Sequence, residues 1–347
     1  MGSESTIVTS ALLLWGSGFL ILGRIRMRGR HVATQHSGTS LSVIIPARNE
    51  EHNLPALLAS LNAQSVRPQE IIVVDDASSD RTADVARSLG ATVLSSQPLP
   101  ADWRGKTWAC QQGADAAHGD TLLFVDADTW FEAFGLERIL AGKSTGALSV
   151  VPYHEVRLPY EQLSVFFNLI MTAATLPDGL FGQMLLVSRA DYRRVGGHEA
   201  VKGRILENFH LAERFREEGI PLRSIPGKGM LSFRMYPNGP SELVEGWTKG
   251  FSSGARKTPE PLLLLIVAWL TGMVLPLGLL PFSAPAVLVY LLFAAQLAII
   301  FRQVGAFRWY TALFYPVPLV FFFAVFALSV LRSGRRATWK GRTIHAD

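Results

Sequence analysis

Three clusters of polar residues in the first half of the chain could bind a charged ligand. They are Ala47-Arg48-Asn49-Glu50, Asp75-Asp76 and Asp126-Ala127-Asp128. Grouped carboxylates repel one another and are costly to desolvate, and a divalent cation relieves both effects. Mg²⁺ and Mn²⁺ prefer oxygen ligands and are usually held by one or two carboxylates together with substrate phosphates. The pattern favours a Mg²⁺ or Mn²⁺ site for a diphosphate, with Asp126 near a nucleotide ribose and Asp128 on the metal. For an isolated Asp-x-Asp, a solvated loop is the alternative.

Each polar cluster directly follows a short apolar run. These runs are Ser42–Ile45, Ile71–Val74 and Thr121–Val125, and residues 50–64 and 79–89 between them have helical spacing. Such alternation predicts an α/β fold in which a mainly parallel sheet carries helices on both faces. Because ligands collect at the carboxyl ends of parallel strands, we expect the three clusters to meet at one edge of the sheet.

The order of the clusters is itself informative. Pro46-Ala47-Arg48-Asn49-Glu50-Glu51, then Val73–Asp80, then Val125–Asp128 resembles the family 2 inverting glycosyltransferases, whose Rossmann-like fold is called GT-A, over residues 40–260. The resemblance implies that a UDP-sugar is the donor and that Asp126 and Asp128 serve its ribose, its diphosphate and the metal. In that family a Gly-Lys lies near the donor, so Lys106 is a candidate donor contact; a surface lysine before a helix is the alternative. The residues expected to cradle the uridine are Pro46, Ala47, Glu50 and Asp76.

A narrower resemblance concerns the acceptor. Leu99–Cys110, Phe233–Tyr236 and Glu245–Gly250 look like the corresponding segments of the 4,4'-diaponeurosporenoate glycosyltransferases. This likeness implies transfer of glucose from UDP-glucose to the carboxylate of a C30 carotenoid acid, giving a glucosyl ester. Another membrane lipid (a hopanoid, a polyprenyl phosphate or a diacylglycerol) is the alternative acceptor, and a non-catalytic membrane scaffold is the alternative from another class.

One departure from the family pattern bears on the mechanism. Where many family 2 enzymes carry Glu-Asp at a helix start, with the Asp as general base, this chain reads Glu207-Asn208. Glu207 is then the remaining candidate catalytic carboxylate, and a helix-start acid favoured by the dipole is the alternative. A hydroxyl acceptor needs a base, whereas a carboxylic acid is already ionised at neutral pH. We therefore expect that Asn208 is tolerated because the acceptor arrives as a carboxylate.

The segment Glu245–Gly250 lies where processive polysaccharide synthases carry Gln-x-x-Arg-Trp, a motif that this chain lacks. Trp247 could stack near the sugar or the acceptor, and Lys249 could meet the charge of the diphosphate. Placement of a tryptophan at the membrane interface is the alternative for Trp247. His154 and His198 have no metal-ligand spacing, and the sequence assigns them no chemistry.

Composition indicates a membrane protein. Hydrophobic residues make up 49% of the chain and charged residues 18%, and the apolar excess collects at residues 6–23 and beyond residue 260. The stretch Thr6–Gly23 has no Lys or Arg before it and four arginines closely after it, which predicts an anchor with its N-terminus outside and the catalytic domain cytoplasmic. Much of the net charge of +5 flanks apolar segments, which favours contact with membrane lipids and argues against nucleic acid. A single cysteine excludes an intrachain disulfide.

The C-terminal part contains three candidate spans, Pro261–Leu280, Ala284–Phe301 and Thr311–Leu331. Three full crossings would put the basic tail outside, against the positive-inside bias, so we expect one segment to be re-entrant or interfacial, with Thr311–Leu331 the first choice. The chain thus reads as a multi-pass protein of the cell membrane. Its expected parts are an anchor with its basic flank (1–30), a GT-A domain (31–260), membrane segments (261–331) and a basic tail (332–347).

Overall fold

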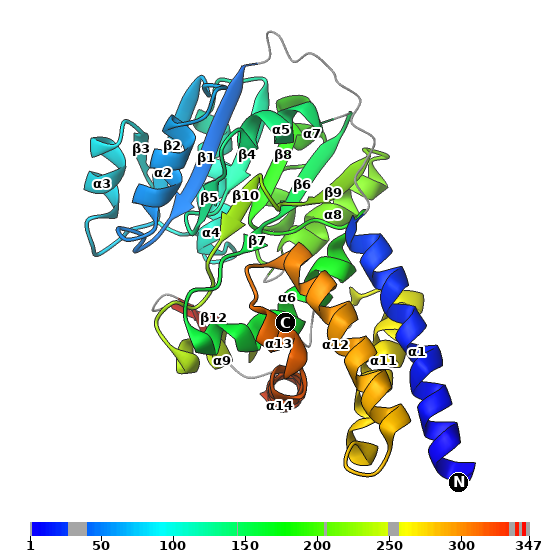
Figure 1. The fold of residues 1–347 in the computed structure, drawn as a ribbon. Coiled ribbons are helices and arrows are strands. Elements are labelled where there is room, and N and C mark those ends of the chain that lie inside the picture. The colour runs from blue at the N-terminus through cyan, green and yellow to red at the C-terminus, as the bar shows by residue number, and fades with distance from the viewer. Residues whose placement is uncertain are drawn as a thin grey trace. The chain divides into compact units, whose positions relative to one another are not determined.

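The computed structural model describes residues 2–26, 40–143, 145–204, 207–248, 257–332, 337–339 and 342–344 (Figure 1). Internal contacts divide the chain into two compact units. The α/β unit draws on residues 28–153, 177–234 and 334–347, and the helical unit on 1–27, 154–176 and 235–333. Residues 154–176, 235–248 and 257–260 thus belong to the helical unit, whereas the sequence groups them with the catalytic domain. The domain boundaries drawn from the sequence stay predictions.

A seven-stranded sheet forms the centre of the α/β unit, in the order β3-β2-β1-β4-β8-β6-β9. Neighbouring strands run parallel except that β8 is antiparallel to both β4 and β6. The predicted α/β fold with a mainly parallel sheet is confirmed. The strands are β1 (Leu41–Ala47), β2 (Glu70–Asp75), β3 (Thr92–Ser95), β4 (Thr121–Val125), β6 (Ala147–Val151), β8 (Met184–Ser188) and β9 (Leu222–Pro226).

Both faces of this sheet are buried, which explains why the strands read as continuous apolar runs. On β1, Val43 and Ile45 pack into one apolar cluster and Ile44 into the other, because successive side chains point to opposite faces. Helix α2 (Leu54–Asn62) covers the first face and α4 (Gly105–Ala116) the second. A Cβ at Gly113 would lie 2.4 Å from Ile44 Cγ2, so α4 can approach the sheet this closely only with glycine there.

Shorter elements complete the α/β unit. Strand β5 (Thr129–Phe131) pairs antiparallel with β10 (Leu231–Phe233), and β11 (Ala337–Trp339) pairs antiparallel with β12 (Arg342–Ile344). The chain passes between the units at β7 (Tyr153–His154). The remaining helices of this unit are α3 (Thr82–Ser88), α5 (Gly135–Ala141), α7 (Arg189–Arg194) and α8 (Glu207–Glu217).

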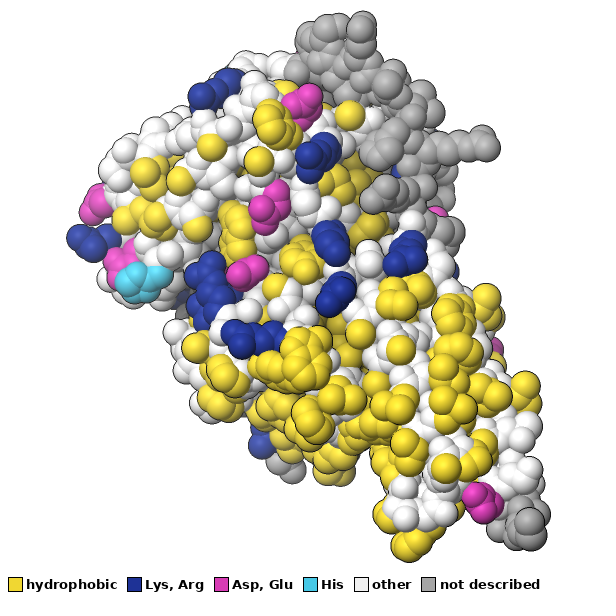
Figure 2. Space-filling view, in the orientation of Figure 1, with side chains coloured by type: hydrophobic (Ala, Val, Ile, Leu, Met, Phe, Trp, Pro, Cys, Tyr) yellow, Lys and Arg dark blue, Asp and Glu magenta, His cyan; other side chains and the backbone are white. Residues whose placement is uncertain are grey.

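The helical unit contains three helices long and apolar enough to cross a membrane, among the described residues. A buried Gln296 ties them together: its amide accepts from Trp269 Nε1 at 2.8 Å and donates to the Trp15 carbonyl oxygen at 3.0 Å. Figure 2 shows hydrophobic side chains over much of the visible face of this unit. The helices are α1 (Gly2–Arg26), α6 (Val165–Thr175), α9 (Pro240–Thr248), α11 (Glu260–Val274), α12 (Ala284–Val304), α13 (Trp309–Leu313) and α14 (Pro316–Arg332).

The last candidate span differs from the other two. The predicted continuous segment 311–331 is divided between α13 and α14, and α14 has only 17 residues, fewer than a span usually needs. In Figure 1, α1, α11 and α12 are seen from the side and run alongside one another, whereas α14 is seen nearly along its axis. Within the helical unit, α14 therefore lies across the direction of the three long helices.

Candidate functional site

The carboxyl ends of β1 and β2 are joined by backbone hydrogen bonds. The Asp76 amide donates to the Ala47 carbonyl oxygen at 2.8 Å, and Arg48 Nη1 donates to the Asp76 carbonyl oxygen at 2.5 Å. Asp76 itself is only 4% exposed. Glu50 follows on the same loop, where its amide donates to Thr82 Oγ1 at 2.7 Å. Four residues expected at the uridine, Pro46, Ala47, Glu50 and Asp76, thus come from two adjoining strand ends.

Two residues on these loops have unusual backbone conformations. Asn49 has a φ of 53° and Ala77 a φ of 52°, in the left-handed region that costs non-glycine residues free energy. The Asn49 conformation is held by its side chain, whose Oδ1 accepts from the Ser79 amide at 2.9 Å. The sequence placed Asn49 in a polar cluster but predicted no special backbone conformation for it or for Ala77. Such conformations concentrate at ligand-binding loops, which marks this edge of the sheet as functional.

A lysine links two carboxylates from distant parts of the sequence. Lys106 in the first turn of α4 lies 2.8 Å from a carboxylate oxygen of Asp126, which follows β4. Its Nζ also lies 3.5 Å from Glu207 Oε1 at the start of α8 and donates to the Gly182 carbonyl oxygen at 3.0 Å. The three charged side chains are 15% to 26% exposed. The arrangement places one positive and two negative charges at the carboxyl end of the sheet.

The carboxylates of Asp126 and Glu207 determine the protonation state of Lys106. Burial alone would lower its pKa, but the carboxylates of Asp126 and Glu207 outweigh that effect and hold the pKa above its ordinary value. Lys106 is therefore an ammonium ion at neutral pH. A partly desolvated ammonium at this edge of the sheet is suited to binding the phosphate oxygens of an anionic ligand.

A small pocket collects several of the predicted residues. Its free volume is about 20 Å³, room for one water-sized group. Four of the predicted site residues line it, together with three residues to which the sequence gave no catalytic role. The first four are Pro46, Lys106, Asp126 and Glu207, and the other three are Cys110, His198 and Asn208.

Asn208 has a structural reason to be an amide. Its Nδ2 donates to the Leu180 carbonyl oxygen at 2.7 Å. An aspartate at this position would set a carboxylate oxygen against that carbonyl oxygen, and two acceptors at such a distance repel each other. The position to which the family resemblance assigns a general base thus carries a hydrogen-bond donor here, and this donor is bonded to the backbone.

Asp128 is the carboxylate that the sequence predicts to hold a divalent cation together with substrate phosphates. Asp128 lies between β4 and β5, two residues after Asp126, and is partly buried. Within the described ranges, no three residues of the types His, Cys, Asp and Glu lie close enough to bind a metal by themselves. Mg²⁺ and Mn²⁺ at nucleotide sites take one or two carboxylates and fill the remaining positions with phosphate oxygens and water. Asp128 is the residue we expect to hold such an ion.

Trp247 and Lys249 stand apart from this group. Trp247 belongs to the helical unit, where it is 3% exposed, stacks on Phe167 with ring centroids 4.7 Å apart and donates from its indole to Ser164 Oγ at 3.2 Å. These contacts make it a core residue of that unit, and its contact with a sugar or acceptor stays a prediction. Lys249 lies outside the described residues.

Comparison with known proteins agrees with this geometry. Residues 42–154 match the glycosyl transferase family 2 model. The 4,4'-diaponeurosporenoate glycosyltransferase of Staphylococcus haemolyticus is 37% identical over 287 residues, covering 78% of this chain and 76% of that protein. The Staphylococcus aureus protein of the same name is 37% identical over 330 residues, covering 87% and 88%.

Comparison with solved structures supports the fold assignment. A mannosyltransferase from Pyrobaculum calidifontis, in complex with GDP-mannose and Mn²⁺, matches with a TM-score of 0.57 over 94% of this chain and 98% of that chain. Sequence identity is 17%, so the likeness concerns the course of the backbone. The match includes the GT-A-like sheet and the apolar helices outside it.

Proposed function

The chain belongs to glycosyltransferase family 2, and from that premise we propose that it transfers glucose from UDP-glucose, with inversion, to the carboxylate of 4,4'-diaponeurosporenoate. The product is a glucosyl ester of this C30 carotenoid acid. The observation that carries the proposal is the charged triad of Lys106, Asp126 and Glu207 at the carboxyl end of the sheet, beside an amide where a base is common. The similarity to the staphylococcal proteins supports the acceptor.

Donor binding is assigned to the two strand-end loops and the triad. Pro46, Ala47, Glu50 and Asp76 hold the uridine, and Asp126 reaches the ribose. The Lys106 ammonium lies against the diphosphate, where it offsets negative charge. A Mg²⁺ or Mn²⁺ ion held by Asp128 and phosphate oxygens would supply further positive charge for the departing UDP.

The transfer step needs no proton movement when the acceptor is a carboxylate. One carboxylate oxygen attacks the anomeric carbon from the face opposite the diphosphate. The new C–O bond forms as the bond from that carbon to the phosphate oxygen breaks, and UDP leaves with the electron pair. Because the carboxylic acid is ionised at pH 7, the step proceeds without a general base. Glu207 then serves to position Lys106, and Asn208 takes the place of the base.

The test compares acceptors that differ only in the reacting group. The full-length protein in lipid nanodiscs is incubated with UDP-[¹⁴C]glucose, Mn²⁺ and either 4,4'-diaponeurosporenoate, its methyl ester or the corresponding primary alcohol. We expect an alkali-labile β-glucosyl ester from the acid alone and a strong loss of rate with EDTA. Glucosylation of the alcohol at a similar rate would refute the carboxylate mechanism. Transfer only to a hopanoid, a polyprenyl phosphate or a diacylglycerol in parallel reactions would refute the carotenoid acceptor and leave the glycosyltransferase assignment intact.

We also propose a membrane topology. Trp15 of α1 donates to the Leu292 carbonyl oxygen of α12, and a Cβ at Gly18 would meet Gln296 one turn further on, so α1 and α12 run in the same direction. Helix α11 runs the opposite way, and residues 275–283 between α11 and α12 carry no charge. Arg24 and Arg26 lie in the last turn of α1 and Arg302 in the last turn of α12, and Arg308 follows α12 by four residues.

These features support two C-terminal crossings and a cytoplasmic tail. The arginine-bearing ends and the catalytic domain lie in the cytoplasm by the positive-inside bias, and the uncharged 275–283 loop lies outside with the N-terminus. Helix α14 lies along the membrane interface and does not cross the membrane. The basic tail therefore stays in the cytoplasm, as the positive-inside bias requires. A C-terminal green fluorescent protein fusion is expected to fluoresce and a C-terminal alkaline phosphatase fusion to be inactive. The reverse result would refute this topology.

A further inference from the structure

His198 lies at the site without a role in the chemistry above. It is 5% exposed and lines the small pocket with Lys106 and Glu207. It follows Gly196 and Gly197, whose φ angles of 82° and 58° turn the chain sharply. A Cβ at Gly197 would lie 2.8 Å from an oxygen of Gln111, so position 197 has no room for a side chain. The turn therefore sets His198 in a fixed position beside the pocket.

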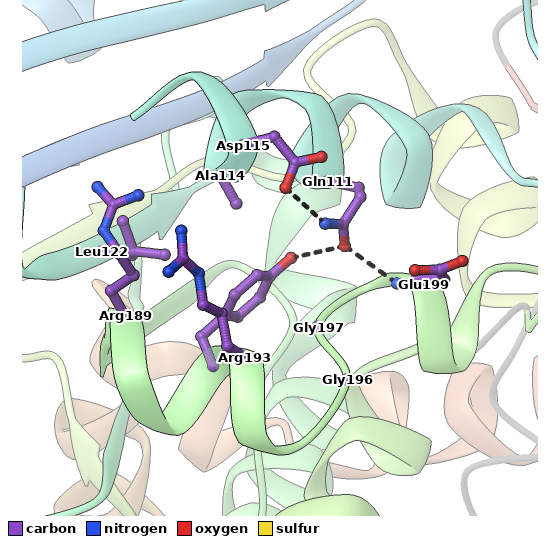
Figure 3. A pocket seen from close by; sticks show the side chains of 10 residues that line it. Gln111, Ala114, Asp115, Leu122, Arg189, Arg193, Gly196, Gly197 and Glu199 are labelled. Carbon is purple, nitrogen blue, oxygen red and sulfur yellow. Dashed lines mark hydrogen bonds between the residues drawn. The ribbon is translucent and has the colours of Figure 1, made fainter. Parts of the chain in front are cut away.

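The orientation of the Gln111 amide is determined by two neighbours. Its Nε2 donates to Asp115 Oδ1 at 3.0 Å, and its Oε1 accepts from the Glu199 amide at 3.1 Å (Figure 3). A carboxylate only accepts and a backbone N–H only donates, so exchanging the amide oxygen and nitrogen would break both bonds. Gln111 therefore presents an acceptor, its Oε1, to anything else that contacts it on that side.

The Tyr192 hydroxyl links the Gln111 amide to the His198 ring. It lies 3.1 Å from Gln111 Oε1 and 2.8 Å from His198 Nδ1, and it also accepts from the His198 amide at 3.0 Å. Tyr192 has one hydroxyl proton, and Gln111 Oε1 has none, so the tyrosine must donate to the glutamine. The remaining contact is satisfied only if His198 Nδ1 carries a proton and donates it. His198 is thereby held as the Nδ1–H tautomer, which leaves a lone pair on Nε2.

His198 Nε2 is an acceptor in need of a donor. Burial, assisted by the charge of Lys106, lowers the pKa of His198 to about 3, so the ring is neutral at physiological pH. Within the part of the chain that the structure describes, Nε2 has no hydrogen-bond partner. Nε2 is not fully enclosed and keeps some accessible surface, so a hydrogen-bond donor from outside the protein can reach it. The donor is expected to come from a ligand.

We propose that His198 Nε2 accepts a hydrogen bond from a hydroxyl group of the bound sugar. This assignment rests on the proposed function, since it takes the ligand to be a nucleotide sugar. The pocket has room for one water-sized group, which a single sugar hydroxyl matches and a whole ring does not. The carotenoid carboxylate is excluded as the partner because it carries no proton and would repel the lone pair. His198 is then a residue that selects the sugar, positioned by Gln111 and Tyr192.

The tautomer is tested first, without substrate. The full-length protein, labelled with ¹⁵N-histidine and held in nanodiscs, is examined by NMR, and the His198 ring signals are those absent from a His198→Gln variant. We expect a protonated Nδ1 and an unprotonated Nε2 in the wild type. Tyr192→Phe removes the hydroxyl that fixes the ring, and the signals are expected to shift toward the Nε2–H form. A wild-type ring protonated on Nε2 would overturn the inference, whatever the enzyme's activity.

The ligand is tested on the same sample. With Mn²⁺ present, UDP-glucose is expected to move the Nε2 signal and UDP alone is not. His198→Phe is expected to raise the KM for UDP-glucose roughly 5- to 10-fold, the usual effect of losing one hydrogen bond, with UDP affinity unchanged. His198→Gln, which keeps an acceptor, retains more of the affinity. A signal that moves equally with UDP, or stays fixed while calorimetry shows UDP-glucose bound, would overturn the sugar contact. Absence of UDP-glucose binding would refute the proposed donor and the sugar contact together.

Discussion

Replacing Glu207 by Gln separates a base from a positioning residue. The substitution keeps size and hydrogen-bonding capacity and removes one negative charge. In the structure that charge lies 3.5 Å from Lys106 Nζ, and Lys106 retains Asp126 at 2.8 Å and the Gly182 carbonyl oxygen at 3.0 Å. The ammonium therefore keeps its stronger partners in the variant. If Glu207 only positions Lys106, the loss in activity should be modest.

The expected size of that loss follows from the geometry. In a medium of effective dielectric constant about 20, charges about 3.5 Å apart attract by roughly 5 kcal/mol before solvation is counted. Glu207 is 15% exposed and Lys106 26%, so water and the retained partners screen most of this attraction. Measured net values for partly exposed ion pairs are about 1 kcal/mol, which corresponds to roughly a fivefold fall in kcat/KM. Loss of a general base would cost about 10²- to 10⁴-fold.

The assay is steady-state transfer from UDP-glucose to 4,4'-diaponeurosporenoate by full-length protein in nanodiscs. Glu217→Gln is the matched control, since Glu217 lies on the same helix, pairs with Arg214 at 2.8 Å and is absent from the pocket lining. Wild type and control should agree, and Glu207→Gln should lie within about tenfold of both. A fall of kcat by about 100-fold or more, with unchanged KM and melting temperature, would refute the base-free mechanism.

Four further outcomes are expected. Asn208→Asp should not speed transfer to the acid and should lower the melting temperature, because it removes the donor to the backbone; a faster enzyme would contradict the mechanism. Gln296→Leu should destabilise the helical unit by about 1–2 kcal/mol in thermal melts in detergent, since the Trp269 indole loses its acceptor, and an unchanged melt would contradict the buried contact. Burial opposes ionisation of Glu70, but hydrogen bonds from Ser42 and His118 hold its pKa below the ordinary 4.5. The stability advantage of wild type over Glu70→Gln should therefore be full above pH 4.5 and fall as the pH drops below that value, and a difference independent of pH would be inconsistent with it. Burial also raises the pKa of the Cys110 thiol, so iodoacetamide at pH 8 should label it far more slowly than after denaturation, as mass spectrometry would measure.

The strands of the sheet could be predicted because each is marked by a short apolar run, a signal that is local in the sequence. The runs 42–45, 71–74 and 121–125 became the centres of β1, β2 and β4, since strands buried on both faces must be apolar throughout. The polar clusters that follow these runs lie at the strand ends, because polar side chains are costly to bury inside a sheet that is covered on both faces. The antiparallel β8 was not predicted, because an apolar run has the same appearance whichever way its strand runs. The break at 314–315 between α13 and α14 directly precedes Pro316, which cannot donate a helix hydrogen bond and begins the second helix.

The sequence by itself determined the order of the three polar clusters, the family and the apolar segments, because each depends on residue type and on spacing along the chain. Only the tertiary structure decided that Lys106 meets Glu207, that Trp247 is buried against Phe167, and that His198 contacts Tyr192 through Nδ1 beside the pocket. Each of these depends on which side chains from distant segments are packed together and desolvated. Neither periodicity nor composition records that information, because hydrogen-bond direction and charge pairing are fixed only once the elements have packed.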